Sequence, residues 1–314
     1  MISILMSAYN AEKWIDKSIK SVLDQSFKNW EFIIVNDGSS DKTKEILEKY
    51  SKADEKIKIF NKENTGLTKS LNFGLERCNG KYIARLDADD LCLPNRLSTQ
   101  YDFMQQNPEV VLCGSYHYEK NGDTNNLKLC KYPKSNNELK NNLLNVREFF
   151  SHSSSMFLKD TVKDFDGYSE RFKKTQDFDL WLKLSSVGKM SCIDQPLVEI
   201  LKHDNSISKS NKGFDQYSYG VVAASLYLIY EEKNIWLDKI MDEKTWDNMM
   251  QEANDIIQSE PYVKGLMLDK RKLAYQPIQL IKNYKYISHW LIFKFFGSSL
   301  PIKLSKKIIK SHDI

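Results

Sequence analysis

The first 90 residues alternate between short apolar runs and longer amphipathic segments, and this alternation restricts the fold more than any other feature. Four apolar runs have the length of buried strands, and they cover residues 2–7, 31–35, 57–60 and 82–86. The segments between them carry apolar residues at helical spacing, as Leu67, Leu71 and Leu75 do. Strands and helices in strict alternation predict a parallel, doubly wound α/β sheet.

Polar residues follow three of these predicted strands. Ala-Tyr-Asn at 8–10 follows the first, Asn-Asp-Gly-Ser at 36–39 the second, and Asp-Ala-Asp at 87–89 the fourth. In parallel sheets ligands bind outside the carboxyl ends of the strands. Three polar clusters at the same edge therefore predict a ligand site there.

Three carboxylates lie within four residues at the end of the fourth strand, at Asp87, Asp89 and Asp90. Alternate residues of an extended chain face the same way, so Asp87 and Asp89 can converge. Two converging carboxylates repel unless a cation lies between them, and a hard divalent ion with oxygen ligands meets that demand. The alternative is a turn in which Asp89 or Asp90 caps a helix that follows near Pro94.

Capping residues also predict where two helices begin. Asn10 is expected to cap the first helix, with Glu12 in its first turn. Residues 93–106 are expected to form a later helix with Pro94 in its first turn. Both helices would then begin close to the polar residues at a strand end.

Length and charge restrict the class of protein. A chain of 314 residues has room for one large domain and a smaller one. The net charge of +4 is too mild to indicate a nucleic-acid partner. The five cysteines are odd in number and form no CxxC, which is typical of reduced thiols in a cytoplasmic protein. We see no signal peptide and no apolar run near the roughly 20 residues that span a bilayer, so a cytoplasmic location is expected.

The motifs at the strand ends resemble those of the family 2 glycosyltransferases, the large inverting group with the GT-A fold. The matching runs are Ser-Ala-Tyr-Asn at 7–10, Asn-Asp-Gly-Ser-Ser-Asp at 36–41, Glu-Asn-Thr-Gly at 63–66, Asn-Gly-Lys-Tyr-Ile at 79–83 and Asp-Ala-Asp-Asp at 87–90. The resemblance covers residues 1–205, and we expect a separate helical region at 206–314. It implies a Rossmann-like, mostly parallel sheet flanked by helices.

The resemblance implies that a nucleotide-sugar donor binds at these strand ends. Ala8, Tyr9 and Glu12 would line the nucleoside pocket, and Asp37 would accept a hydrogen bond from the base, typically uracil. Asn64 would join them from the loop at 63–66. The alternatives are local: Asp37 would form a turn before a helix, and Asn64 would be an ordinary loop residue.

The donor diphosphate and its cation would lie beside the acidic motif. The resemblance implies that Asp87, next to Ala88, touches the ribose or the metal, and that Asp89 binds Mg²⁺ or Mn²⁺. Such a cation suits the chemistry because a nucleoside diphosphate leaves with growing negative charge. A basic residue would meet the phosphates, and Lys69 and Arg85 are both candidates.

The run Gln-Asp-Phe-Asp-Leu-Trp at 176–181 resembles the acid-bearing helix start of the same family. It implies that Asp177 is the general base, which takes the proton from the acceptor hydroxyl in a single inverting displacement. Asp179 is the next candidate, and the alternative is that Asp177 only complements the helix dipole. Gln176 and Trp181 are expected on the acceptor or phosphate side.

Two histidines complete the expected site. His152 would meet the phosphate or the acceptor, and its alternative is a loop histidine with a backbone partner. His203 follows a predicted last strand at 196–203 and would complete the metal site, where an imidazole among carboxylates suits Mn²⁺ better than Mg²⁺. Family members often carry an arginine two residues before this histidine, whereas this chain has Leu201.

The last hundred residues carry no catalytic motif. Helices are expected at 214–230, 244–258 and 266–275. The tail at 282–310 interleaves seven lysines with large apolar residues. This pattern predicts peripheral contact with an anionic membrane at the cytoplasmic face, or a helix pair that packs on the catalytic domain or forms a homodimer.

The sequence therefore predicts a metal-dependent inverting glycosyltransferase. It would move a hexose or N-acetylhexosamine from a UDP-sugar to a glycan or lipid-linked acceptor in surface polysaccharide synthesis. A sugar-nucleotide pyrophosphorylase would share the sheet and the metal, but its first strand is usually followed by a Gly-rich, Arg-containing loop that is absent here. The other alternative is an inactive subunit that only binds the nucleotide-sugar.

Overall fold

The computed structural model describes residues 1–122, 126–203 and 214–259. The chain forms two compact units, residues 1–210 and residues 211–314. The domain boundary expected between residues 205 and 206 lies outside the described residues, as do the predicted helix at 266–275 and the lysine-rich tail.

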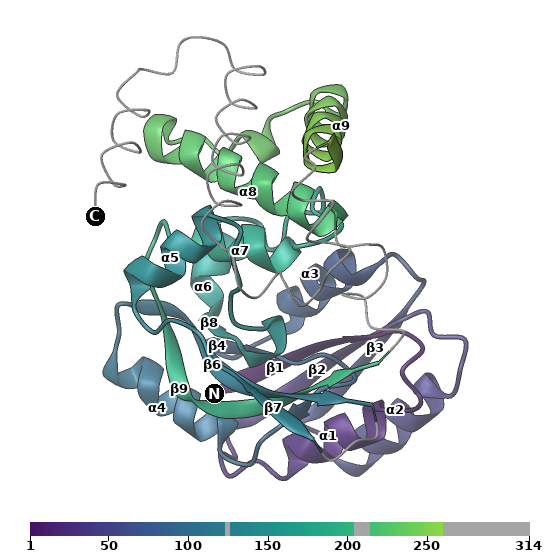
Figure 1. Ribbon diagram of the computed structural model, residues 1–314. Coiled ribbons are helices and arrows are strands. Elements are labelled where there is room, and N and C mark those ends of the chain that lie inside the picture. The colour runs from purple at the N-terminus through teal and green to yellow at the C-terminus, as the bar shows by residue number, and fades with distance from the viewer. Residues whose placement is uncertain (123–125, 204–213, 260–314) are drawn as a thin grey trace. The chain divides into compact units, whose positions relative to one another are not determined.

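A nine-stranded sheet forms the centre of the first unit (Figure 1). Its strands follow the order β3-β2-β1-β4-β8-β6-β9-β5, and β7 pairs with β6. The four strands at one side are parallel, and they are β3 (Ile57–Lys62), β2 (Trp30–Asp37), β1 (Ile2–Ala8) and β4 (Tyr82–Arg85). The predicted parallel, doubly wound half of the sheet is therefore confirmed.

The other side of the sheet mixes directions. It contains β8 (Met156–Leu158), β6 (Val110–Asn121), β9 (Lys189–Lys202), β5 (Leu91–Cys92) and β7 (Leu127–Cys130). Strand β8 runs antiparallel to β4 and β6, whereas β9 runs parallel to β6. Strand β6 begins with the buried residues 110–115 and continues into a second half that is partly exposed and carries polar residues.

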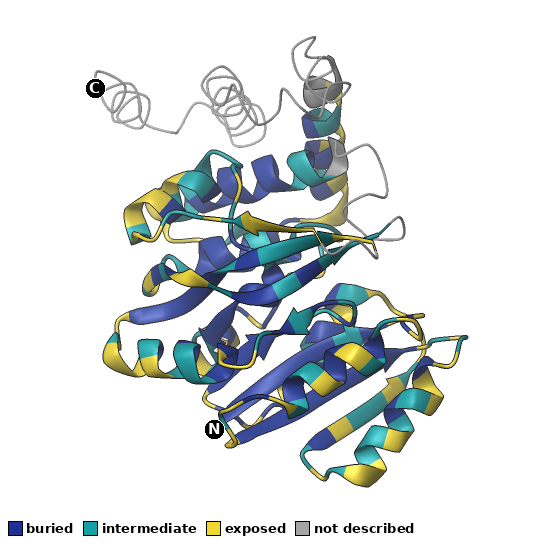
Figure 2. Ribbon diagram, turned by 60° about the horizontal axis from the view of Figure 1, so that its bottom comes forward, coloured by how far each residue is buried: buried dark blue, intermediate teal, exposed yellow. Residues whose placement is uncertain are grey.

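Helices cover both faces of the sheet (Figure 1). On one face lie α1 (Ile15–Leu23), α2 (Thr43–Ala53) and α4 (Arg96–Gln106), and on the other α3 (Leu67–Arg77), α6 (Lys159–Lys163) and α7 (Gln176–Leu184). Helix α5 (Asn136–Leu144) follows β7 in the chain. Figure 2 shows that the central strands are buried, while exposed residues lie on the outer sides of the helices, in loops and on β7.

Strand β1 shows how alternation builds this core. Ile4 and Met6 belong to the cluster that packs beneath α1 and α4, and neither is exposed. Leu5 faces the opposite side, toward α3, as successive residues of a strand must. There Gly74 brings α3 close to the sheet, since a Cβ atom at this glycine would lie 2.4 Å from the Leu5 Cδ1 atom.

Both predicted helix starts are wrong. Helix α1 begins at Ile15, because Asn10 adopts a φ of +49° and its side-chain oxygen accepts a hydrogen bond from the Ser40 amide (2.9 Å). Asn10 thus joins two loops instead of capping a helix. Helix α4 begins at Arg96, because the chain first pairs with β9 as strand β5.

The second unit is helical where the structure describes it. It contains α8 (Phe214–Lys233) and α9 (Glu243–Ser259), which pack on each other. The middle of α8 is buried on several sides at Val221, Val222 and Ala224. Within the described ranges, none of the helices combines the length and the apolar content that crossing a bilayer requires.

Candidate functional site

A pocket of about 540 Å³ opens at the carboxyl ends of β1, β2 and β4. Its walls come from segments that are far apart in the sequence, and the end of β9 closes one side. The residues of the predicted site that line this pocket are Tyr9, Asp37, Asn64, Asp87, Ala88, Asp89 and His203. The structure therefore brings these seven residues together at the edge that the strand pattern indicated.

Asp37, the last residue of β2, is held from the neighbouring strand and loop. Its Oδ1 atom accepts hydrogen bonds from the Lys62 Nζ (2.5 Å) and the Thr65 amide (3.0 Å), and its Oδ2 atom accepts one from the Gly66 amide (2.9 Å). Burial alone would raise the pKa of Asp37, but these hydrogen bonds, led by that from Lys62, lower it. The site thus presents a fixed, ionised carboxylate.

The local alternative for Asp37 is wrong. The turn before α2 is formed by Asn36, whose side-chain oxygen accepts a hydrogen bond from the Ser39 amide (3.2 Å). Gly38 adopts a φ of +74°, and a Cβ atom there would lie 2.6 Å from the Asn64 amide nitrogen. The glycine of this motif therefore allows the loop at 63–66 to approach the end of β2.

Arg85 and Ser153 fix the side chain of Asp87. Arg85 is fully buried and forms an ion pair with the Asp87 carboxylate, whose other oxygen accepts a hydrogen bond from the Ser153 hydroxyl (2.9 Å). Burial would raise the pKa of Asp87, but the charge of Arg85 lowers it. Arg85 is therefore engaged with Asp87 and does not line the pocket, while Lys69 is exposed near Glu170 (3.7 Å).

Asp89 and His203 form the opposite wall. The His203 Nε2 atom lies 2.9 Å from the Asp89 Oδ2 atom, and the imidazole stacks on the indole of Trp14 at a centroid distance of 4.1 Å. Burial and then the negative charge of Asp87 raise the pKa of Asp89. Trp14 is a site residue that the motifs did not reveal, because it precedes α1 in a segment without a recognisable pattern.

Asp90 explains how residues from distant parts of the chain meet here. Its buried side chain accepts a hydrogen bond from the Leu201 amide (3.1 Å), two residues before His203. The capping alternative is wrong, since α4 follows Asn95 and no side chain caps it. Burial and the neighbouring carboxylates raise the pKa of Asp90 well above its usual range.

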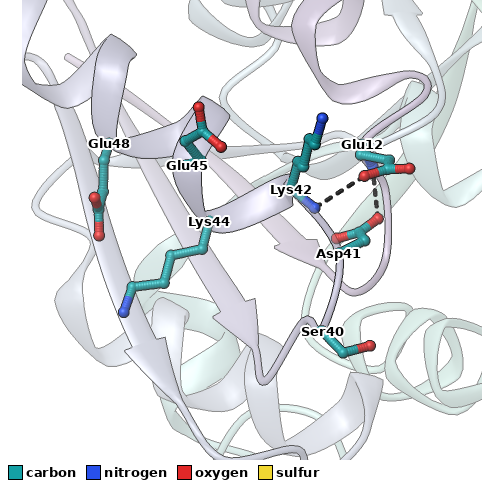
Figure 3. A pocket seen from close by; sticks show the side chains of 7 residues that line it. All are labelled: Glu12, Ser40, Asp41, Lys42, Lys44, Glu45 and Glu48. Atoms are coloured by element: carbon teal, nitrogen blue, oxygen red, sulfur yellow. Dashed lines mark hydrogen bonds between the residues drawn. The ribbon is translucent and has the colours of Figure 1, made fainter.

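Two further residues of the expected nucleoside pocket lie outside it. Ala8 is buried at the end of β1. Glu12 lies in a neighbouring hollow, where its carboxylate accepts a hydrogen bond from the Lys42 amide (2.9 Å) and its own amide donates to Asp41 (3.1 Å) (Figure 3). Glu12 therefore holds the start of α2 instead of lining the pocket.

The residues expected on the acceptor side come from α7 and from the turn at His152–Ser154, and none of them lines the pocket. His152 is buried, and its Nε2 atom lies 2.8 Å from the hydroxyl of Tyr168 and not at a backbone group. The indole of Trp181 packs against the edge of the same imidazole, with the centroids 5.7 Å apart. Gln176 is buried at the first position of the helix.

Asp177 is the half-buried second residue of α7. Its Oδ1 atom accepts a hydrogen bond from the Phe178 amide (2.9 Å). Burial raises its pKa, and the charge of Asp87 raises it further. Asp179, the second candidate base, is instead buried in an ion pair with Lys183 (2.9 Å), so its carboxylate is already used within the helix.

Comparison with known proteins gives a family match and several relatives. Residues 3–165 match the family model described as glycosyl transferase family 2. An uncharacterized glycosyltransferase of Haemophilus influenzae is 28% identical, over 100% of this chain and 98% of its own length. The O-antigen biosynthesis glycosyltransferase WbnJ of Escherichia coli is 36% identical, over 59% of this chain and 71% of its own.

A solved structure shares the fold. The S. aureus TarS fragment 1–349, in complex with UDP-GlcNAc, superposes with a TM-score of 0.59 at 18% identity. The alignment covers 95% of this chain and 93% of that one. This likeness confirms the GT-A fold that the sequence motifs predict.

Proposed function

This chain belongs to glycosyl transferase family 2, and from that premise we propose a metal-dependent inverting transfer of a hexose or N-acetylhexosamine from a UDP-sugar. The acceptor would be a hydroxyl of a glycan or lipid-linked glycan. The observation that carries the proposal is the convergence of Asp37, Asp87, Asp89 and His203 in one pocket. The name of the relative WbnJ, which refers to O-antigen biosynthesis, supports a role in surface polysaccharide synthesis.

Asp37 is suited to recognise the base of the donor. Its ionised carboxylate is held by Lys62 and two backbone amides, and a carboxylate oxygen can accept more than one hydrogen bond. An imide N–H, such as that of uracil, is a donor of the required kind. Tyr9 is 54% exposed beside the pocket, where its ring offers a surface for stacking.

Asp89 and His203, with Asp87 beside them, would hold a divalent cation. The donor set fits, because the pKa of Asp89 is raised by burial and by the charge of Asp87, a repulsion that a cation would remove. A bound Mn²⁺ or Mg²⁺ would offset the negative charge that develops on the leaving diphosphate. Trp14 orients the imidazole by stacking, and Ser153 orients Asp87.

Asp177 would act as the general base. Its carboxylate would take the proton of the acceptor hydroxyl while that oxygen bonds to the anomeric carbon and the bond to the diphosphate breaks. One displacement of this kind inverts the anomeric configuration and releases UDP. The raised pKa of Asp177, caused by burial, makes the carboxylate a stronger base than one in water.

The place of this reaction in the cell stays a prediction. We propose a cytoplasmic enzyme that contacts an anionic membrane through residues 282–310, or forms a homodimer through them. These residues lie outside the described part of the chain. The charge pattern in the sequence is the support for this proposal.

The test is a thermal-shift titration of the full chain with UDP and GDP, with Mn²⁺ or with EDTA, followed by an assay of UDP release from UDP-sugars. UDP with Mn²⁺ should raise Tm more than GDP does, and a ligand at 100-fold its Kd stabilises by about 2.7 kcal/mol. Asp37→Asn should weaken the response to UDP, whereas Asp194→Asn, at an exposed pair with Lys134, should not.

The outcomes separate the alternatives. If neither UDP nor GDP raises Tm, this pocket is not the donor site. Binding of UDP-sugars without release of UDP, with or without acceptor glycans, would favour the inactive binding subunit. Formation of a UDP-sugar from a sugar phosphate and UTP would favour the pyrophosphorylase.

A further inference from the structure

A second group of possible metal ligands lies on the hairpin of β6 and β7, away from the residues that line the donor pocket. One donor atom from each of His117, Glu119 and Cys130 lies within 4.8 Å of the other two. The strand register explains the cluster. His117 and Cys130 are direct cross-strand partners, and His117 and Glu119 lie two residues apart on the same face of β6.

His117 carries a nitrogen that has no hydrogen-bond partner in the described part of the chain. The side chain is 3% exposed, and its Nδ1 atom is buried with no hydrogen bond to any described residue. Leaving a buried polar group unsatisfied costs about 1–3 kcal/mol. Burial also lowers the pKa of His117 to about 4, so the imidazole is neutral at physiological pH, the form that binds metals.

Cys130 supplies a free thiol from the facing strand. It is half-buried, and burial followed by the nearby charge of Glu119 raises its pKa to about 11. The thiol is therefore protonated at neutral pH, and an ion that binds its sulfur must release that proton.

Glu119 supplies the third donor. Its carboxylate lies 3.6 Å from the ammonium groups of both Lys128 and Lys202. These separations are longer than a direct hydrogen bond, so neither lysine occupies a carboxylate lone pair with good geometry. The side chain of Lys128 is 74% exposed and can turn toward solvent when a cation approaches.

We propose that His117, Glu119 and Cys130 bind one borderline-soft divalent cation of the Zn²⁺ or Co²⁺ class, with a fourth position open to water. Nitrogen, oxygen and sulfur donors together are a zinc ligand set, and a thiolate disfavours Mg²⁺ and Mn²⁺. Tetrahedral ligands of Zn²⁺ are about 3.3–3.8 Å apart, given bonds of about 2.0–2.3 Å. Donors that already lie within 4.8 Å of one another need only a small closure to reach this spacing.

The charges support a single ion at this place. One thiolate and one carboxylate offset the two positive charges of the ion. Lys202 lies 3.6 Å from Glu119 and directly precedes His203, so the proposed site lies along the strand that leads to the donor pocket.

The test is a titration of the reduced full chain with Co²⁺, followed by ultraviolet absorption of the thiolate-to-cobalt charge transfer. The band should saturate at about one equivalent, and Zn²⁺ should displace it while excess Mn²⁺ does not. The site at Asp89 and His203 has no sulfur, so it cannot give this band. Calorimetry in buffers of different ionisation heat should report release of about one proton for each Zn²⁺ bound.

Variants decide the assignment. Cys130→Ser should lose the band entirely, and Glu119→Gln should weaken Co²⁺ binding by about tenfold, with circular dichroism as the check of folding. Tyr132→Phe, next to the His117 ring but not a ligand, is the matched control and should keep the band. Absence of a charge-transfer band in the wild type, or its persistence in Cys130→Ser, would overturn the proposal.

Discussion

At the amino ends of the parallel strands, the buried Glu31 carboxylate accepts hydrogen bonds from the Ser3 hydroxyl (2.6 Å), the Lys58 ammonium (2.8 Å) and the Asn79 amide (2.5 Å). At the carboxyl ends of the same strands, Asp89 and Asp90 have carboxylates for neighbours. Burial would raise the pKa of Glu31, but its hydrogen bonds lower it to about 2. Burial and the charge of Asp87 instead raise the pKa of Asp89, and burial and the charges of Asp89 and Asp87 raise that of Asp90.

The difference teaches what each edge of the sheet contributes. Glu31 is satisfied by the protein alone, so its ionised form stabilises the fold. Asp89 and Asp90 have raised pKa values, so their ionised forms cost stability until a cation binds. Removing the carboxylate at the amino edge should therefore lower stability. Removing a carboxylate at the carboxyl edge should lower activity without lowering stability.

The largest effect is expected for activity, at Asp177 of α7, whose pKa is raised by burial and by the charge of Asp87 at the carboxyl edge. Asp177→Asn keeps the shape of the side chain but removes the base, so kcat should fall by about 10²–10⁴-fold. The wild-type rate should decrease as the pH falls through the raised pKa of Asp177, because the base must be ionised. UDP should still raise the Tm of the variant.

Asp179→Asn is the matched control on the same helix. It breaks a buried ion pair with Lys183 and should lower stability, while the protein that stays folded transfers sugar normally. Near wild-type turnover by Asp177→Asn would contradict the assignment of the base.

The second effect is expected at the amino edge, for stability. The fall in the pKa of Glu31 from 4.5 to about 2 corresponds to about 3 kcal/mol, so Glu31→Gln should lose up to that much at pH 7. Because the folded pKa is depressed, the stabilisation is present above pH 4.5 and is lost as the pH falls toward 2. Urea unfolding at several pH values measures this difference.

The exposed pair of Glu45 and Lys49 supplies the control. Glu45→Gln should change the free energy of unfolding by no more than about 0.5 kcal/mol at any pH. An equal loss in Glu31→Gln at pH 7 and at pH 3 would show that packing, and not charge, accounts for the effect.

The sequence predicted the carboxyl edge well because its signals are local. Parallel strands must end at the same edge, so Asp37 and Asp87 could be placed together from the alternation alone. The pairing of Asp89 with His203 rested on the family resemblance, since 114 residues separate them. The parallel half of the sheet was predicted correctly for the same reason, because each of its strands and helices shows its own apolar period in the sequence.

Contacts between loops were not predictable in this way. The sequence could not show that Arg85 is buried against Asp87 rather than open to phosphates, because an arginine at a strand end is compatible with both. The sequence also did not reveal that Trp14 stacks on His203 or that Lys62 binds Asp37. The register pairs Lys62 with Asp37 across β2 and β3, so this pair could have been found once the strand ends were known.

The smallest effect is expected for the stability of Asp89→Asn. Its stability change should have the opposite sign to that of Glu31→Gln, so it tests the difference between the two edges most directly. Asp89→Asn removes a carboxylate whose folded pKa is raised, so in EDTA the variant should be as stable as the wild type or slightly more stable. A raised carboxyl pKa lowers stability as the pH rises above about 4, so this small gain should be greatest near pH 7 and disappear near pH 4. Glu31→Gln should instead lower the stability at every pH above 4.5.

Addition of Mn²⁺ and UDP should make the wild type more stable than Asp89→Asn. The wild type should gain Tm by mass action, and Asp89→Asn should gain little, because the cation loses a carboxylate ligand. Differential scanning fluorimetry at pH 7 with EDTA, Mn²⁺, and Mn²⁺ plus UDP measures all three states. If Asp89→Asn is much less stable than the wild type in EDTA, then the carboxylate is satisfied by His203 alone, and the two edges of the sheet do not differ as argued.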